Sequence, residues 1–390
     1  MSATDHDVVL DPGGDRRQPA KRGTPRSASG GRPGFVRRHR RVLVSLLGGL
    51  VALGLFYYVV PQIAGLGPTI RRLRGGDLWW LAVGIVLEVI SFVGDVALFR
   101  GVFAARSSGI GWRTSTQIML AGAAATKFVA TAGAGGVAIT VWALRGFGLP
   151  GAQVATGMMC YEILTYAVYM MSLAIGGFGL YLGLFAGRAP FGITVVPATF
   201  GVLVILIVLS MLVVEEPVER FLLRRADHAG ARWQAWWRRV AALPRSIRTG
   251  LQAALAMVKR RDPSVLGAVA AWYFDIGTLW ASFHAFGPAP SPAVIVMGYF
   301  VGTLANVLPL PGGIGGVEGG MIGCFIAFGV HAQLAILAVL AYRTISYWLP
   351  TIPGAIAYFR LRAAVGAAEK RSGETRDKPV SSAAAGFQHR

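Results

Sequence analysis

Long apolar stretches separated by short polar connections make up most of this sequence. Six of them, over residues 42–64, 78–103, 151–184, 190–214, 264–286 and 334–358, reach the length of about 20 residues that a helix needs to cross a bilayer. Their apolar residues are not spaced alternately, as they are in the strands of a membrane barrel. The pattern therefore predicts an all-α, polytopic integral membrane helical bundle with about six full spans.

Two further apolar segments are interrupted by glycine and proline. In residues 291–329 the break contains Pro309 and Pro311, and in residues 115–148 it lies at Gly133. Such residues do not sustain a helix, and irregular backbone at membrane depth needs protein or a water-filled cavity around it. We expect each segment to be a re-entrant hairpin, and two short tilted spans are the alternative.

The two broken segments belong to an internal repeat. Gly133-Ala-Gly-Gly-Val137 matches Gly313-Ile-Gly-Gly-Val317 at a separation of 180 residues, and Tyr161–Tyr166 faces Tyr342–Tyr347 at 181. Three predicted spans lie between the breaks, and an odd number inverts the second copy relative to the first. Inverted repeats with broken helices are typical of secondary transporters.

Composition and charge agree with a membrane protein. Hydrophobic residues make up 54% of the 390 residues and charged residues 14%, whereas soluble domains have about 25% charged residues. The net charge of +20 gathers near both ends and in residues 215–262, so the positive-inside rule places these parts in the cytoplasm. This distribution indicates the cytoplasmic membrane and does not indicate a nucleic-acid partner.

The same distribution divides the chain. Residues 1–41 and 363–390 read as disordered cytoplasmic tails around a membrane domain of residues 42–362. Within that domain, residues 215–262 combine Trp and Arg as an amphipathic helix on the inner leaflet does. Cys160 and Cys324 lie in apolar runs without the spacing of a zinc or disulfide site, so no metal or cofactor is predicted.

Ionisable residues inside apolar segments are costly and mark candidate sites. Together with the glycines of the breaks, the predicted substrate-binding residues are Glu88, Lys127, Gly133, Gly135, Gly136, Glu162, Gly312, Gly313, Gly315, Gly316, Glu318 and Arg343. Weaker candidates are Asp95, Asp275 and His284.

Each candidate has a role and a structural alternative. Cationic side chains and free backbone amides suit a lipid phosphate, whereas the carboxylates can balance charge or bind a cationic headgroup. In the structural alternatives Glu318 caps a half-helix, Arg343 pairs with Glu162, Lys127 reaches the inner interface, and the glycines allow close helix packing.

Two motifs carry a family resemblance. Leu308-Pro-Leu-Pro-Gly-Gly-Ile-Gly-Gly-Val-Glu-Gly-Gly320 and Tyr342-Arg-Thr-Ile-Ser-Tyr-Trp-Leu-Pro350 resemble the flippase-like family, which is the membrane region of lysylphosphatidylglycerol synthases and their stand-alone relatives. The resemblance covers residues 42–362. Ile163 stands where the family more often has an arginine after the glutamate at 162.

The resemblance implies a membrane task without an enzymatic one. Full-length members append a soluble aminoacyl-transferase domain, and no foldable segment follows Arg362. The expected function is movement of an aminoacylated, anionic or isoprenoid-linked lipid between leaflets. The main alternative is a scaffold that binds a partner enzyme through residues 215–262. An intramembrane enzyme is disfavoured because no metal cluster or Ser/His pairing stands out.

Overall fold

The computed structural model describes residues 75–104, 110–128, 134–228, 230–307 and 315–376. The chain divides into a unit of residues 1–60 and a unit of residues 61–390, and all the described residues belong to the second unit. The predicted tail 1–41 and the first predicted span, 42–64, lie outside them. The regular elements of the described part are all helical, which confirms the all-α prediction.

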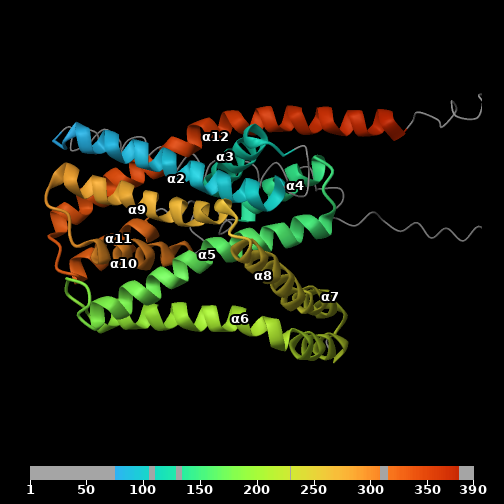
Figure 1. The fold of residues 1–390 in the computed structure, drawn as a ribbon, viewed down its shortest axis with the longest axis horizontal. Coiled ribbons are helices and arrows are strands. Elements are labelled where there is room, and N and C mark those ends of the chain that lie inside the picture. Colours follow the sequence, from blue (N-terminus) through green and yellow to red (C-terminus); the bar gives the residue numbers. More distant parts are fainter. Residues whose placement is uncertain (1–74, 105–109, 129–133, 229, 308–314, 377–390) are drawn as a thin grey trace, which may run out of the picture. The chain divides into compact units, whose positions relative to one another are not determined.

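Five described helices are long and apolar enough to cross a membrane (Figure 1): α2 (Leu78–Ala104), α5 (Gly151–Tyr181), α6 (Phe191–His228), α9 (Leu266–Phe286, after the short η1 at Pro263–Val265) and α12 (Ala332–Arg376). They confirm five of the predicted spans. Two of them continue beyond the predicted ends, because α6 runs past Val214 and α12 runs past Tyr358. Residues 363–376, which we expected in a disordered tail, are therefore helical, and 377–390 lie outside the described residues.

The two broken segments form helical hairpins. The first consists of α3 (Trp112–Phe128) and α4 (Ala134–Gly146), and the second of α10 (Pro292–Thr303), the short η2 (Leu304–Val307) and α11 (Gly316–Ala327). A helix of 12 residues, such as α11, is only about 18 Å long and cannot cross a hydrocarbon core of about 30 Å. The hairpins lie toward opposite ends of the bundle in Figure 1, as re-entrant elements of an inverted repeat should.

The internal repeat extends to the contacts between helices. Helices α2 to α5 correspond in order to α9 to α12, and each hairpin packs on the long helix of the other repeat, α3 on α12 and α10 on α5. Helices α2 and α9 cross where the Ser91 hydroxyl donates to the Ala271 carbonyl at 2.6 Å, between positions 180 residues apart. Equivalent positions can touch only near a symmetry axis, so this crossing lies close to the axis that relates the repeats.

Two apolar cores surround the two hairpins. One core joins α2, α3 and α4 to the first half of α5 and includes Phe99, Phe103 and Leu144. The other joins α9, α10 and α11 to the second half of α5 and the start of α12, and it includes Phe300 and Phe325. Each repeat thus has its own packing centre, and α5 contributes to both.

Residues 215–262 do not form a single amphipathic helix. They comprise the end of α6, α7 (Ala231–Ala241) and α8 (Leu243–Lys259). Helix α8 packs on α5, where Gly250 meets the backbone of Met159. The buried Glu215 of α6 pairs with Arg248 of α8 at 2.6 Å. Trp233 and Trp236 of α7 stay exposed, so only the first of these two helices presents the predicted aromatic surface.

Candidate functional site

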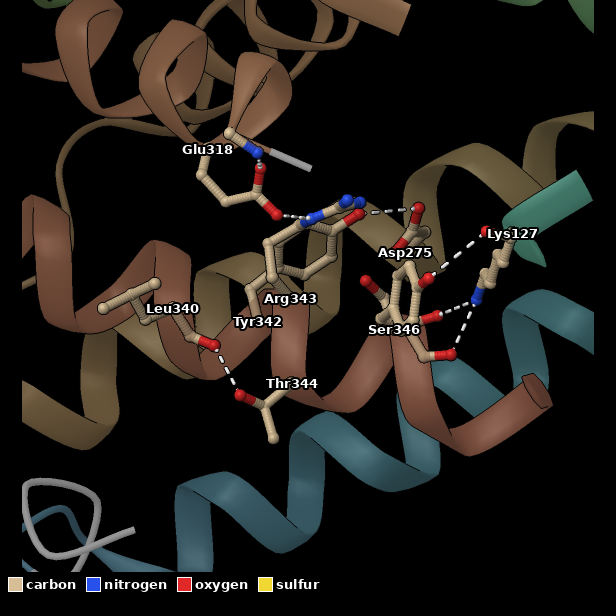
Figure 2. Close-up of polar contacts among 10 residues, drawn as sticks. Lys127, Asp275, Glu318, Leu340, Tyr342, Arg343, Thr344 and Ser346 are labelled. Carbon is tan, nitrogen blue, oxygen red and sulfur yellow. Dashed lines mark hydrogen bonds and ion pairs between the residues drawn. The ribbon is translucent and has the colours of Figure 1, made fainter. Parts of the chain in front are cut away.

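The charged centre of the second repeat is an ion pair between the re-entrant hairpin and α12. The Nε of Arg343 donates to Oε1 of Glu318 at 2.8 Å, and each side chain is 15% exposed. The other carboxylate oxygen of Glu318 accepts the backbone N–H of Gly315 at 2.7 Å and so caps α11 (Figure 2). A carboxylate at a helix N-terminus is favourable because the free amides there carry partial positive charge.

This geometry changes two expectations. Arg343 pairs with Glu318, so the predicted structural pairing with Glu162 is wrong. The amide of Gly315 is occupied by Glu318 and is not open to a lipid phosphate. Gly315 has φ +82°, a left-handed conformation that favours glycine, which explains this residue at the turn into α11.

Lys127 binds the backbone of α12. Its Nζ donates to the carbonyls of Ser346 at 2.9 Å and Tyr347 at 2.8 Å, as Figure 2 shows. In a regular helix the Ser346 carbonyl would accept the N–H four residues on, but that position is Pro350, which has no N–H. Lys127 therefore supplies the donor that the proline removes, and in this structure it neither reaches an interface nor waits for a phosphate.

We expect Lys127→Met to lower the stability of the protein by about 1–3 kcal/mol, because two buried carbonyls lose a donor. In a Pro350→Ala background the loss should be smaller, since an alanine at that position offers its own N–H to the Ser346 carbonyl. Thermal unfolding of the four proteins in detergent gives this double-mutant cycle. Equal losses in both backgrounds would contradict the role assigned to Lys127.

Two buried carboxyl groups lie beside this ion pair. Asp275 on α9 accepts hydrogen bonds at Oδ2 from the hydroxyls of Tyr299 at 2.5 Å and Tyr342 at 3.1 Å. Glu88 on α2 is 8% exposed and interacts with both Asp275 and Lys127. The structure thus brings together Glu88, Lys127, Glu318 and Arg343, which the sequence singled out separately, with the weaker candidate Asp275.

The first repeat has a cavity instead of an ion pair. A space of about 620 Å³ lies between α2, α3, α4 and α5, and Asp95, Glu162, Thr126 and Thr140 are among its lining residues. The Tyr161 hydroxyl donates to Asp95 at 2.5 Å. Among the described residues, Glu162 has no hydrogen-bond partner, and the lining includes no Lys, Arg or His. The cavity is therefore acidic and suits a cation better than a phosphate.

The comparisons with known proteins identify the family. Residues 45–354 match the family described as the lysylphosphatidylglycerol synthase TM region. The chain belongs to this family. The match includes every described helix from α2 to α11 and the first half of α12, so both repeats and both hairpins lie within it.

The curated relatives are membrane proteins with uninformative names. Proteins described as "UPF0104 membrane protein" from Methanothermobacter thermautotrophicus are 25% identical over 83% of this chain and 96% of the relative, and 23% identical over 83% and 94%. A further match is 37% identical over 22% of this chain and 26% of the relative. No solved structure matches. The family is thus established without a description of what the relatives do.

Within this lysylphosphatidylglycerol synthase TM-region fold, the repeats differ for reasons visible in the sequence. At separations of 180 or 181 residues, four cavity-lining residues of the first repeat correspond to larger or oppositely charged ones in the second. The pairs are Phe92 and Trp272, Met119 and Tyr299, Ala138 and Glu318, and Glu162 and Arg343. Trp272 stacks on Tyr169 and lies edge-on to Tyr299, so the space equivalent to the cavity is filled by aromatic rings and the ion pair.

The remaining candidates have packing roles or lie outside the described residues. A side chain at Gly136 would meet the Gly122 carbonyl, so Gly136 lets α3 and α4 approach closely. His284 stacks on Trp80 and belongs to an aromatic cluster. Gly133, Gly312 and Gly313 lie outside the described residues. No cluster of three metal-ligating side chains occurs within the described ranges.

Sequence reasoning missed the tyrosines that hold the two aspartates. Tyr161 with Asp95 and Tyr342 with Asp275 form the same hydrogen bond once in each repeat. The signal was available, because the two aspartates are 180 residues apart and the two tyrosines 181. Applying the repeat to ionisable residues as well as glycines would have found both pairs.

Proposed function

We propose that this protein moves a lipid between the leaflets of the cytoplasmic membrane, with the headgroup passing through the first-repeat cavity. The observation that carries the proposal is the acidic cavity itself, bordered by a hairpin too short to span. Ionisable groups inside a membrane are costly and are kept where a polar substrate or ion passes. Two inverted repeats with a broken element each also match the architecture of secondary transporters.

The charges favour one of the candidate lipid classes. Arg343 and Lys127, the groups we expected to hold a phosphate, are engaged within the protein. Asp95 and Glu162 face the cavity without a cation among its lining residues. A phospholipid with a cationic headgroup, such as an aminoacylated one, fits this site better than an anionic or polyprenyl-phosphate-linked lipid. That the protein has no enzymatic activity stays a prediction.

Reconstitution tests the proposal. Labelled phosphatidylglycerol, its lysyl ester and a polyprenyl phosphate are placed in liposomes with the purified full-length protein, and their transbilayer movement is compared with that in empty vesicles. We expect the lysyl ester to move fastest. Equal rates with and without protein for all three lipids would refute the proposal.

Glu162→Gln should slow movement of the lysyl ester about tenfold, because a charge-assisted hydrogen bond contributes about 1.5–3 kcal/mol. The matched control is Glu216→Gln, the same change on the exposed surface of α6, and it should keep the wild-type rate. The same assay serves both variants. A wild-type rate in Glu162→Gln would exclude this carboxylate from the path.

A scaffold role is the second candidate, and α7 favours it. Trp233 and Trp236 are 62% and 49% exposed, and Arg238 and Arg239 end the same helix. If this surface binds a partner enzyme, the Trp233→Ala/Trp236→Ala variant should lose co-purifying protein and keep its fold. Retained lipid movement in that variant would favour transport over scaffolding.

A further inference from the structure

Two buried carboxyl oxygens face each other at the crossing of α2 and α9 without a donor. Glu88 Oε2 and Asp275 Oδ1 have no hydrogen-bond partner in the described part of the chain. The two carboxyl groups lie within hydrogen-bonding reach of each other. An ionised carboxylate only accepts hydrogen bonds, whereas a protonated one also donates. A single proton between the two groups therefore supplies the missing donor.

The hydrogen bonds indicate how the proton is held. Oδ2 of Asp275 already accepts two tyrosine hydroxyls, so its Oδ1 is the oxygen free to accept from Glu88. A carboxylate that accepts several hydrogen bonds is stabilised in its ionised form. The proton thus belongs mainly on Glu88, with Asp275 as the acceptor.

The surrounding charges require one more positive charge. The titratable and charged groups that interact with this carboxyl pair from the neighbouring helices are Lys127, Tyr299, Tyr342 and Arg343, and Arg343 in turn holds Glu318. Glu88, Asp275 and Glu318 give three negative charges, and Lys127 and Arg343 give two positive ones. One bound proton makes this buried group neutral, which matters because an unbalanced charge away from water is costly.

The groups present favour a proton over a metal cation. Hard cations such as Ca²⁺ and Mg²⁺ take six or more oxygen ligands, and two carboxyl groups supply at most four. One of those four, Asp275 Oδ2, is already occupied by tyrosine hydroxyls. The nearby Thr278 hydroxyl donates to the Gly84 carbonyl at 3.1 Å.

The pair joins the two repeats. Glu88 belongs to the first repeat and Asp275 to the second, and hydrogen bonds from Ser91 to Ala271 and from Thr278 to Gly84 flank them. Loss of the proton would place two negative charges against each other at this junction, and like charges in a low dielectric repel strongly. Proton release would therefore weaken the contact between the repeats.

We propose that Glu88 and Asp275 share one proton, and that its release and rebinding at the junction of the repeats couple the movement of lipid to the proton gradient. The coupling rests on the proposed function, whereas the proton site itself does not. Two measurements separate these parts.

Infrared spectroscopy of the full-length protein in liposomes tests the site. A protonated carboxylic acid has a C=O stretching band that disappears on ionisation. One such band should be lost in both Glu88→Gln and Asp275→Asn and kept in Glu216→Gln. Glu88→Gln should fold, because its amide can donate to Asp275 in place of the proton. Persistence of every band in both variants, or loss of the band on adding sodium at constant pH, would overturn the site.

Lipid movement under an imposed pH difference tests the coupling. The wild-type rate should change with the direction of the gradient, and the rate in Glu88→Gln should not, because glutamine cannot release a proton. A gradient effect that survives in Glu88→Gln would overturn the coupling. If the band is present and no lipid moves, the proposed function fails and the site stands; if lipid moves and the band is absent, the site fails.

Discussion

Replacing Arg343 by alanine is expected to destabilise the protein by several kcal/mol and to abolish lipid movement. Removing one partner of a buried ion pair costs about 3–5 kcal/mol, because the remaining charge is left uncompensated. Both side chains retain 15% exposure, so the loss should fall toward the lower end of that range. Unfolding in detergent, followed by tryptophan fluorescence, measures it.

The carboxylate partner allows the ion pair to be separated from the helix cap. Glu318→Gln keeps an oxygen that can accept the Gly315 amide and removes the charge opposite Arg343. It should therefore lose the ion-pair contribution alone. Arg343→Ala/Glu318→Gln should be less destabilised than the sum of the two single variants, since neither charge is then left alone. Strict additivity would contradict a direct pair.

The spans and hairpins were predictable because hydropathy and helix breakers are local properties. A continuous apolar run fixes a span wherever it occurs, as in α2 and α9. The ends of spans were less predictable, because α6 and α12 continue into basic segments whose polar residues are compatible with helix. The prolines of α12 did not end it, since Lys127 satisfies the carbonyl that Pro350 leaves free.

The partners within the site depend on tertiary geometry and were not predictable in the same way. The repeat suggested that Arg343 pairs with Glu162, its equivalent. In an inverted repeat, equivalent residues lie on opposite sides of the axis and meet only close to it, as Ser91 and Ala271 do. Arg343 therefore finds its partner within its own repeat, at Glu318. The same symmetry explains why the repeats carry related but unequal sites.

The second large effect is expected from Gly302→Ala, which should prevent α10 and α11 from packing. A Cβ atom at Gly302 would lie 2.8 Å from the Met321 backbone N and Cα, closer than carbon atoms can approach, and the backbone cannot move aside as a flexible side chain can. Overpacking of this kind costs about 1–3 kcal/mol and sometimes more. We expect the upper end, with a reduced yield of folded protein.

The matched control lies on the partner helix. Gly323 of α11 is exposed, and nothing lies within 4 Å of a Cβ added there. Gly323→Ala should be neutral or stabilising by up to about 1 kcal/mol, because alanine favours helix over glycine. In the first hairpin, Gly136→Ala should behave like Gly302→Ala, since its Cβ would lie 2.7 Å from the Gly122 carbonyl oxygen. Unfolding temperatures that fall in all three variants alike would show that the helix interior and not the hairpin contact was disturbed. Losses confined to Gly302 and Gly136 would place the close approach of the helices at the same point in both repeats, as the 180-residue separation of Gly122 and Gly302 requires.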